Sequence, residues 1–240
     1  MTSGSMRHSW LLLLLICEVA LGDGTGMEFG GHTKLRLLGE HFPGDSLFRE
    51  LAGSESVDYE ADLRLDFAAD RGRWSVDAAY QLIALHGDRV DWDRELGSLG
   101  GLAFQRVPND DRRLWDLTHT IRDQGRTAFV HRLDRLVAGF ASEKIVFRFG
   151  RQALSWGNGL FYAPMDLVNP FDPAAIDTEF KAGDDLVYGQ YLRDNGDDFQ
   201  AAHVFRRDPV TGDADPDRST STLKYHGFIG ETEIDLLLAE

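Results

Sequence analysis

The sequence predicts an all-β fold: an antiparallel transmembrane up-and-down β-barrel that is incomplete, with about nine strands visible, short periplasmic turns and long extracellular loops. Two observations predict it. The first is the regular alternation of apolar and charged residues, clearest in residues 57–70, which read VDYEADLRLDFAAD. Because side chains alternate between the two faces of a strand, this segment has one apolar face and one charged face. The second is the alternation of short and long connections between such segments, which is typical of outer-membrane barrels.

The first 22 residues have the three parts of a secretory signal peptide. A basic N-terminal part precedes an apolar run from Trp10 to Cys17. Small residues at Ala20 and Gly22 then mark a cleavage site after Gly22. The apolar run is too short to cross a bilayer as a helix. The mature chain, residues 23–240, then contains no cysteine, so disulfides cannot stabilise it. We expect it to form the N-terminal portion of a barrel in the outer membrane of a Gram-negative bacterium.

The first three expected strands are Thr33–Leu38, Val57–Asp70 and Trp74–Leu85. A long loop near residues 39–56 separates the first two. The second strand is longer than the about 9 to 11 residues that a tilted barrel strand needs to cross a bilayer. A tight turn around Gly72 joins it to the third, because glycine readily adopts the positive φ angles of such turns.

The remaining segments continue the same rhythm. Long loops are expected near residues 87–127 and 154–183, and Asp111–Gln124 within the first of them is a candidate short helix. An Asn-Gly pair, the strongest short hairpin signal in the chain, follows Asp194. The expected strands here are Leu133–Phe140, Ile145–Gln152, Asp185–Leu192, Phe199–Arg206, Thr222–Ile229 and Glu233–Ala239.

A half-buried strand of a secreted β-sandwich is the alternative for residues 57–70 taken alone. A sandwich has no reason to place long connections at one end and short ones at the other, so the rhythm favours the barrel. Nine is an odd number, and the last segment stops in mid-strand at Glu240. Because an open sheet edge in lipid is costly, we expect the chain to be part of a longer barrel.

Charge and motif patterns exclude several functions. The chain has 40 acidic and 25 basic residues, a net charge of −15, which is unsuited to nucleic-acid binding. The histidines show no metal-ligand spacing, and no serine, histidine and carboxylate set can be placed together, so we expect no enzyme, no metal and no cofactor. The acidic run from Asp208 to Asp217 matches no complete calcium-binding loop, so a solvated loop is favoured over a calcium site.

The most distinctive irregular segment is Arg148–Pro173, which reads RFGRQALSWGNGLFYAPMDLVNPFDP. Its FGRQ, SWGNG and NPF parts resemble the strand and loop of alginate-export-type porins and related Gram-negative outer-membrane proteins. The resemblance implies a barrel with a polar lumen and an inward-folded loop that passes a polysaccharide or another small solute. Constriction of a pore and packing over the barrel mouth are both open for this loop. The expected loop residues are Trp156, Gly157, Asn158, Gly159, Phe161 and Tyr162.

The alternation also indicates which side chains line the lumen. The expected pore-lining or substrate-binding residues are Lys34, Arg36, Arg64, Arg148, Arg151 and Gln152. Carboxylates of residues 57–70 share the lumen, and this mixed charge departs from the strongly basic pore expected for alginate. We therefore expect a porin-like channel for a hydrophilic or anionic solute, possible substrates including oligo- and polysaccharides. The alternative is a structural or adhesive barrel with a plugged lumen. Expected partners are outer-membrane lipid, lipopolysaccharide and the barrel-assembly machinery.

Overall fold

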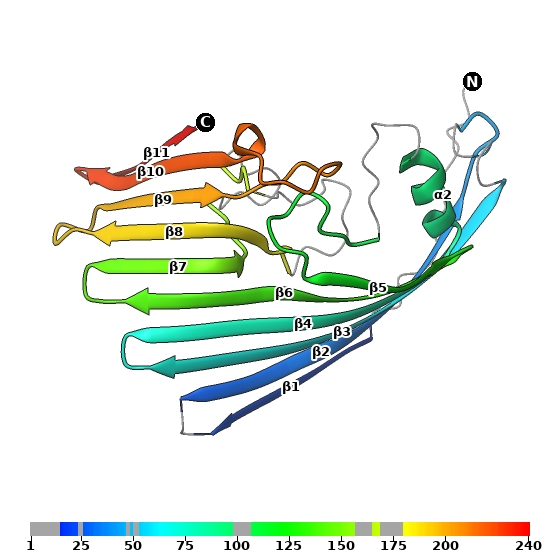
Figure 1. Ribbon diagram of the computed structural model, residues 1–240, viewed down its shortest axis with the longest axis horizontal. Coiled ribbons are helices and arrows are strands. Elements are labelled where there is room, and N and C mark those ends of the chain that lie inside the picture. Colours follow the sequence, from blue (N-terminus) through cyan, green and yellow to red (C-terminus); the bar gives the residue numbers. More distant parts are fainter. Residues whose placement is uncertain are drawn as a thin grey trace.

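The computed structural model describes residues 15–23, 26–46, 49, 53–97, 107–156, 165–168 and 180–240. They form one antiparallel sheet of eleven strands, ten of which follow one another in the order β1-β2-β3-β4-β6-β7-β8-β9-β10-β11 (Figure 1). The strands are β1 (Leu15–Asp23), β2 (Met27–His41), β3 (Glu55–Arg71), β4 (Trp74–Gly87), β5 (Thr118–Gln124), β6 (Thr127–Ala141), β7 (Ile145–Gln152), β8 (Asp184–Leu192), β9 (Asp198–Val204), β10 (Thr220–Ile229) and β11 (Thr232–Ala239). The all-β, up-and-down fold class is confirmed, and the sheet is open, with β1 and β11 at its two ends.

Every strand expected from the sequence is present, and several are longer than expected. The β3 strand has 17 residues, and its neighbours β2 and β4 have 15 and 14. The β2 strand starts six positions before Thr33, since it also includes Met27–His32, with Gly30 and Gly31 in extended conformation. A Cβ atom on Gly31 would lie 2.4 Å from the backbone oxygen of Arg64, so glycine permits the close approach of β3. The β1 strand overlaps the predicted leader, and cleavage after Gly22 would leave β2 at that end of the sheet.

The connections separate by length, as the sequence predicts. Tight turns join β3 to β4, β6 to β7, β8 to β9 and β10 to β11 at one end of the sheet, on the left in Figure 1. The long connections lie at the other end, together with the tight turn between β5 and β6. Gly72 and Gly196 occupy tight turns with φ angles of +66° and +90°, which L side chains rarely adopt. We call the two ends the turn end and the loop end.

One expected element is wrong. Residues Asp111–Gln124 do not form a helix; part of this segment is strand β5, and the helix of this connection is α2 (Asp88–Gly97). The β5 strand pairs with β6 from Thr127 to Arg132, where β7 no longer reaches. Its β-branched residues suit a strand, and its pairing satisfies β6 backbone groups beyond the end of β7.

The two faces of the sheet differ in what covers them. Helix α2 packs through Val90 onto Ile83 and Leu85 of β4. The connection after β7 packs through Trp156 onto Leu186 of β8, on the same face, because residues directly opposite in neighbouring strands share a face. We call this covered side the inner face and the other side the outer face.

Candidate functional site: a polar inner face

Burial along β2 and β3 is inverted relative to a sheet of a water-soluble protein. On β2, Lys34 is 8% exposed and the next residue, Leu35, is 44% exposed. On β3, Arg64 is 3% exposed and Leu65 is 51% exposed. On β2 and β3 the polar side chains therefore lie on the inner face and the apolar side chains on the outer face. A sheet whose core lies between its layers shows the opposite arrangement. Farther along the sheet the inner face also carries buried apolar side chains, among them Ile83, Val130 and Leu186.

An aspartate on a β-bulge organises the centre of the inner face. The register of β6 against β4 shifts at Asp134, which is an extra residue on β6. Its carboxylate accepts hydrogen bonds from Arg64 at 2.9 Å, from Arg135 at 2.6 Å and from the backbone N–H of Gly183 at 3.1 Å. Arg132 lies 3.3 Å away as a further ion-pair partner. One buried carboxylate thus holds three guanidinium groups from two strands.

Further polar contacts extend this cluster across β3 and β4. Arg132 donates to the side-chain oxygen of Gln81 at 2.8 Å, and Gln81 donates to Asp62 at 3.1 Å. Arg64 also donates to Asp66 at 2.8 Å. Positive and negative groups alternate through the cluster, so it braces the strands against one another.

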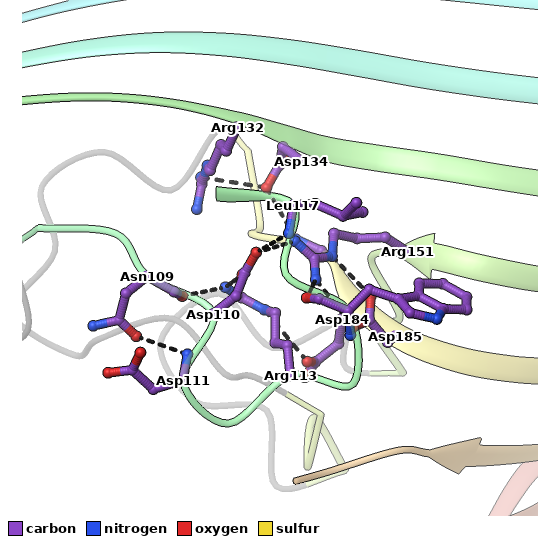
Figure 2. A network of polar contacts seen from close by, with 12 residues as sticks. Asn109, Asp110, Asp111, Arg113, Leu117, Arg132, Asp134, Arg151, Asp184 and Asp185 are labelled. Carbon is purple, nitrogen blue, oxygen red and sulfur yellow. Dashed lines mark hydrogen bonds and ion pairs between the residues drawn. The ribbon is translucent and has the colours of Figure 1, made fainter. Parts of the chain in front are cut away.

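A second network fills the gap along the edge of β6 between the ends of β7 and β5 (Figure 2). Arg151 is 1% exposed and donates to Asp185 at 2.7 and 3.0 Å, to Asp110 at 2.8 Å and to the carbonyl oxygen of Trp115 at 2.6 Å. Burial alone would raise the pKa of Asp110, but the hydrogen bonds and charges of Arg151 and Arg113 outweigh it and hold this pKa below its usual range. The network fixes residues 107–117 to the loop end of the sheet.

Contacts beyond Arg151 continue the same attachment. Arg113 pairs with Asp110 at 2.9 Å and lies 3.6 Å from Asp184. Arg206, which follows β9, donates to both oxygens of Asp184 at 2.5 and 2.6 Å. Arg113 and Arg206 also form an isolated β-bridge. The connection between α2 and β5 is therefore tied to β8 and to the end of β9.

The connection after β7 begins against the inner face. Trp156 is 8% exposed and donates its indole N–H to Gln200 at 2.6 Å. It belongs to a buried apolar cluster with Val168, Leu186, Tyr188, Ala202 and Val204. Residues at both the start and the middle of the connection thus pack on β8 and β9.

The end of the same connection reaches the first strands of the sheet. The ring of Phe180 stacks on His32 with a centroid distance of 4.7 Å, and the cationic groups of Lys34 and Arg64 lie over it at 5.0 and 4.7 Å. Lys181 donates to the carbonyl oxygen of Leu154 at 2.7 Å and pairs with Asp166. The described parts of the connection therefore contact β8 and β9 near its start and β2 and β3 near its end.

The structure brings most of the predicted lumen residues onto one face. Lys34, Arg36, Arg64 and Arg148 lie on the inner face, and Arg36 pairs with Glu60. Arg148 is exposed, whereas Lys34 and Arg64 are buried. Arg151 pairs in register with Leu136, which is 42% exposed, so Arg151 alternates to the face opposite Arg148.

The other predicted residues have different outcomes. Gln152 is 6% exposed and its side chain donates to the backbone oxygen of Leu186 at 3.4 Å. Trp156 is placed on the inner face as described above. The other expected loop residues lie outside the described residues: Gly157, Asn158, Gly159, Phe161 and Tyr162.

Sequence reasoning missed several residues of this face. The alternation around Asp134 breaks at the bulge, so a strict period of two cannot place Asp134 and Arg135 on the same side. Phe180 gave no local signal, because its partners on β2 and β3 lie far away in the sequence. Asp110 lies in an irregular segment whose position depends on Arg151.

One described group has the residue types of a metal site. The ligand atoms of His226, Glu233 and Asp235 lie within 4.8 Å of one another on β10 and β11. Lys224 lies 2.9 Å from Asp235, and His226 Nδ1 lies 3.1 Å from it. A divalent cation would have to displace the ammonium group, so these contacts fit a cross-strand ion pair better than a metal site.

Comparisons of the chain with protein-family models, with curated proteins and with solved structures gave no match. Within the part of the chain that the structure describes, no helix is both long enough and apolar enough to cross a membrane.

Proposed function

We propose that this chain forms part of a porin-like barrel in the outer membrane, whose inner face is the wall of a channel for a hydrophilic or anionic solute. The observation that carries this proposal is the inverted burial along β2 and β3, with Arg64 buried beside an exposed Leu65. Lipid stabilises an apolar outer face, and water or polar loops stabilise a charged inner face. The predicted leader supports export to that membrane.

The dimensions of the outer face support the same proposal. Outer-face positions of β3 from Val57 to Ala69 carry no charged side chain. The 13 residues from Val57 to Ala69 exceed the about 9 to 11 that a tilted strand needs to cross a bilayer. Aromatic residues gather toward the turn end, where Trp74 contacts Phe140 at 5.1 Å between centroids, as in an interfacial aromatic belt.

The solute path is expected beside the connection after β7. The described ends of this connection lie against the inner face, because Trp156 packs on β8 and β9 and Phe180 contacts β2 and β3. Arg148 is the exposed arginine of the predicted lumen set, so it has the greatest influence on ion selectivity. The resemblance of residues 148–173 to alginate-export-type porins extends the proposal to oligo- or polysaccharides.

Conductance in planar bilayers tests the proposal. The purified protein should give ion-conducting steps, and Arg148→Glu should shift their selectivity toward cations. Arg218→Glu makes the same charge change in the exposed connection before β10 and should shift selectivity less. If Arg148→Glu and Arg218→Glu change the ion selectivity equally, Arg148 does not line the conducting path.

A barrel with a plugged lumen is the second candidate. It is favoured by the ion pairs of two inner-face arginines, Arg64 with the buried Asp134 and Arg36 with Glu60. Heat-resistant insertion into vesicles with no conductance under any condition would favour this structural or adhesive role over a channel.

A further inference from the structure

The outer face bears a basic patch at the loop-end half of β5 and β6. We define the outer basic patch as Arg122, His119 and His131. His119 and His131 are directly opposite one another, with ring centroids 5.3 Å apart. A β-bulge between Thr120 and Arg122 returns Arg122 to the outer side, where it lies opposite Phe129. His119 and Arg122 are both exposed.

None of the described outer-face neighbours of the patch on β4 or β6 is acidic. The neighbouring outer-face positions of β4 are Tyr80, Leu82 and Ala84, and those of β6 are Phe129 and Leu133. Asp123 lies opposite Ala128 and therefore belongs to the inner face. Among the described residues, no acidic side chain forms an ion pair with Arg122. Arg122 is thus an exposed cation on a chain whose net charge is −15.

The position of the patch along the strands selects its ligand. His131 is opposite Leu82, and Trp74 marks the turn end of the same strand. Trp74 to Leu82 is a stretch of nine residues, within the about 9 to 11 that a tilted strand needs to cross a bilayer. The patch thus lies one membrane-crossing length from the aromatic residues at the turn end. Tyr80, 5.8 Å from His131 between ring centroids, supplies an aromatic ring of the kind found at membrane interfaces.

We propose that the outer basic patch binds the phosphate of an anionic lipid headgroup. This inference rests on the proposed membrane location. A guanidinium group binds a phosphate through two parallel hydrogen bonds, and each imidazole contributes an N–H donor. The acyl chains of the same lipid lie against the uncharged outer face toward the turn end.

Lipid retention measured by native mass spectrometry tests the proposal. The full chain is inserted into phosphatidylcholine vesicles with or without phosphatidylglycerol, in the presence of EDTA, and then extracted in mild detergent. We expect phosphatidylglycerol to be retained in preference to phosphatidylcholine. Arg122→Gln should weaken that retention about fivefold, since a basic residue near a membrane surface has an effect of this size. Substitution of all three patch residues by glutamine should abolish the preference.

Matched variants and controls decide the result. His203→Gln with Arg218→Gln removes an outer-face imidazole and a guanidinium elsewhere and should retain the preference. Equal retention by the wild type and the triple patch variant would overturn the proposal. Displacement of the lipid by millimolar inorganic phosphate would show an adventitious anion site and would also overturn it. Protease protection in vesicles is measured in parallel: failure to insert contradicts the proposed function itself, whereas insertion without a lipid preference contradicts only the patch.

Discussion

Replacing Arg151 by methionine should cost far more stability than any surface substitution. Arg151 is 1% exposed and holds the carboxylates of Asp110 and Asp185, which are 3% and 0% exposed. Arg151→Met leaves Asp185 buried without its cation and leaves Asp110 with Arg113 alone as its partner. Removal of one partner of a buried ion pair costs about 3–5 kcal/mol, and we expect a loss in this range. Arg193→Met breaks an ion pair whose arginine is 50% exposed and should cost less than about 1 kcal/mol.

A compensated variant separates the ion pair from the packing of the side chain. Asp110 and Asp185 also accept backbone N–H groups, from Leu117 at 2.7 Å and Trp115 at 2.8 Å. The triple variant Arg151→Met, Asp110→Asn, Asp185→Asn keeps amide oxygens for these donors and removes the stranded charges. It should recover at least half of the lost free energy of unfolding.

Urea unfolding of the refolded protein in detergent micelles, followed by tryptophan fluorescence, measures these differences. Equal losses for Arg151→Met and Arg193→Met would refute the reasoning. A triple variant no more stable than Arg151→Met would show that side-chain packing, rather than charge, explains the loss.

Three further substitutions test other parts of the structure. Folding lowers the pKa of Asp110, so the stability that its carboxylate contributes is complete above the unfolded pKa of about 3.9 and is lost as the pH falls through the folded pKa. The urea midpoint should therefore fall more between pH 6 and pH 3 in the wild type than in Asp110→Asn. Gly150 has a φ of +133°, and a Cβ there would lie 2.2 Å from the backbone oxygen of Leu136. Gly150→Ala should therefore lower the free energy of unfolding by about 1–3 kcal/mol. A Cβ on Gly189 meets no atom within 4 Å, so Gly189→Ala should have little effect, and equal losses for the two variants would contradict the clash. Trp156→Ala should cost about 3–5 kcal/mol and speed proteolysis near Leu154, because it removes a buried side chain that holds the connection on β8 and β9; an unchanged cleavage rate would argue against that anchoring.

The strands were predictable wherever one face is charged and the other apolar. The segment 57–70 was expected as a strand, and β3 extends it by only two residues at one end and one at the other. The turns at Gly72 and Gly196 were equally clear, because their positive φ angles favour glycine. Gly30 and Gly31 hid the start of β2, since a glycine carries no side chain to show the alternation.

The long connections could not be predicted in the same way. Thr118–Gln124 becomes a strand because β6 offers an unpaired edge beyond β7, a condition that no local pattern records. The bulge at Asp134 changes the period of β6 at the residue that joins three arginines. Contacts such as Phe180 with His32 depend on the path of the connection, and sequence patterns report neighbours in the chain.

The faces predicted for the middle of β3 did carry over into the structure. Leu63, Leu65 and Phe67 lie on the outer face, and Arg64 and Asp66 lie on the inner face. The ion-pair partners of the arginines show which of them can influence the charge of the lumen. Arg64 is engaged by Asp134, whereas Arg148 remains exposed. Its exposure makes Arg148 the better probe of solute passage.

Depth-dependent quenching along β3 tests the membrane assignment most directly. The chain contains one cysteine, Cys17, within the predicted leader, so single cysteines can be introduced into the mature protein without competition. A fluorophore is attached at Leu65→Cys, Asp66→Cys, Phe67→Cys or Ala68→Cys after insertion into vesicles. Spin-labelled lipid should quench the probes at 65 and 67, and aqueous iodide should quench those at 66 and 68. Quenching by lipid at all four positions, or at none, would contradict a sheet that faces lipid with one side.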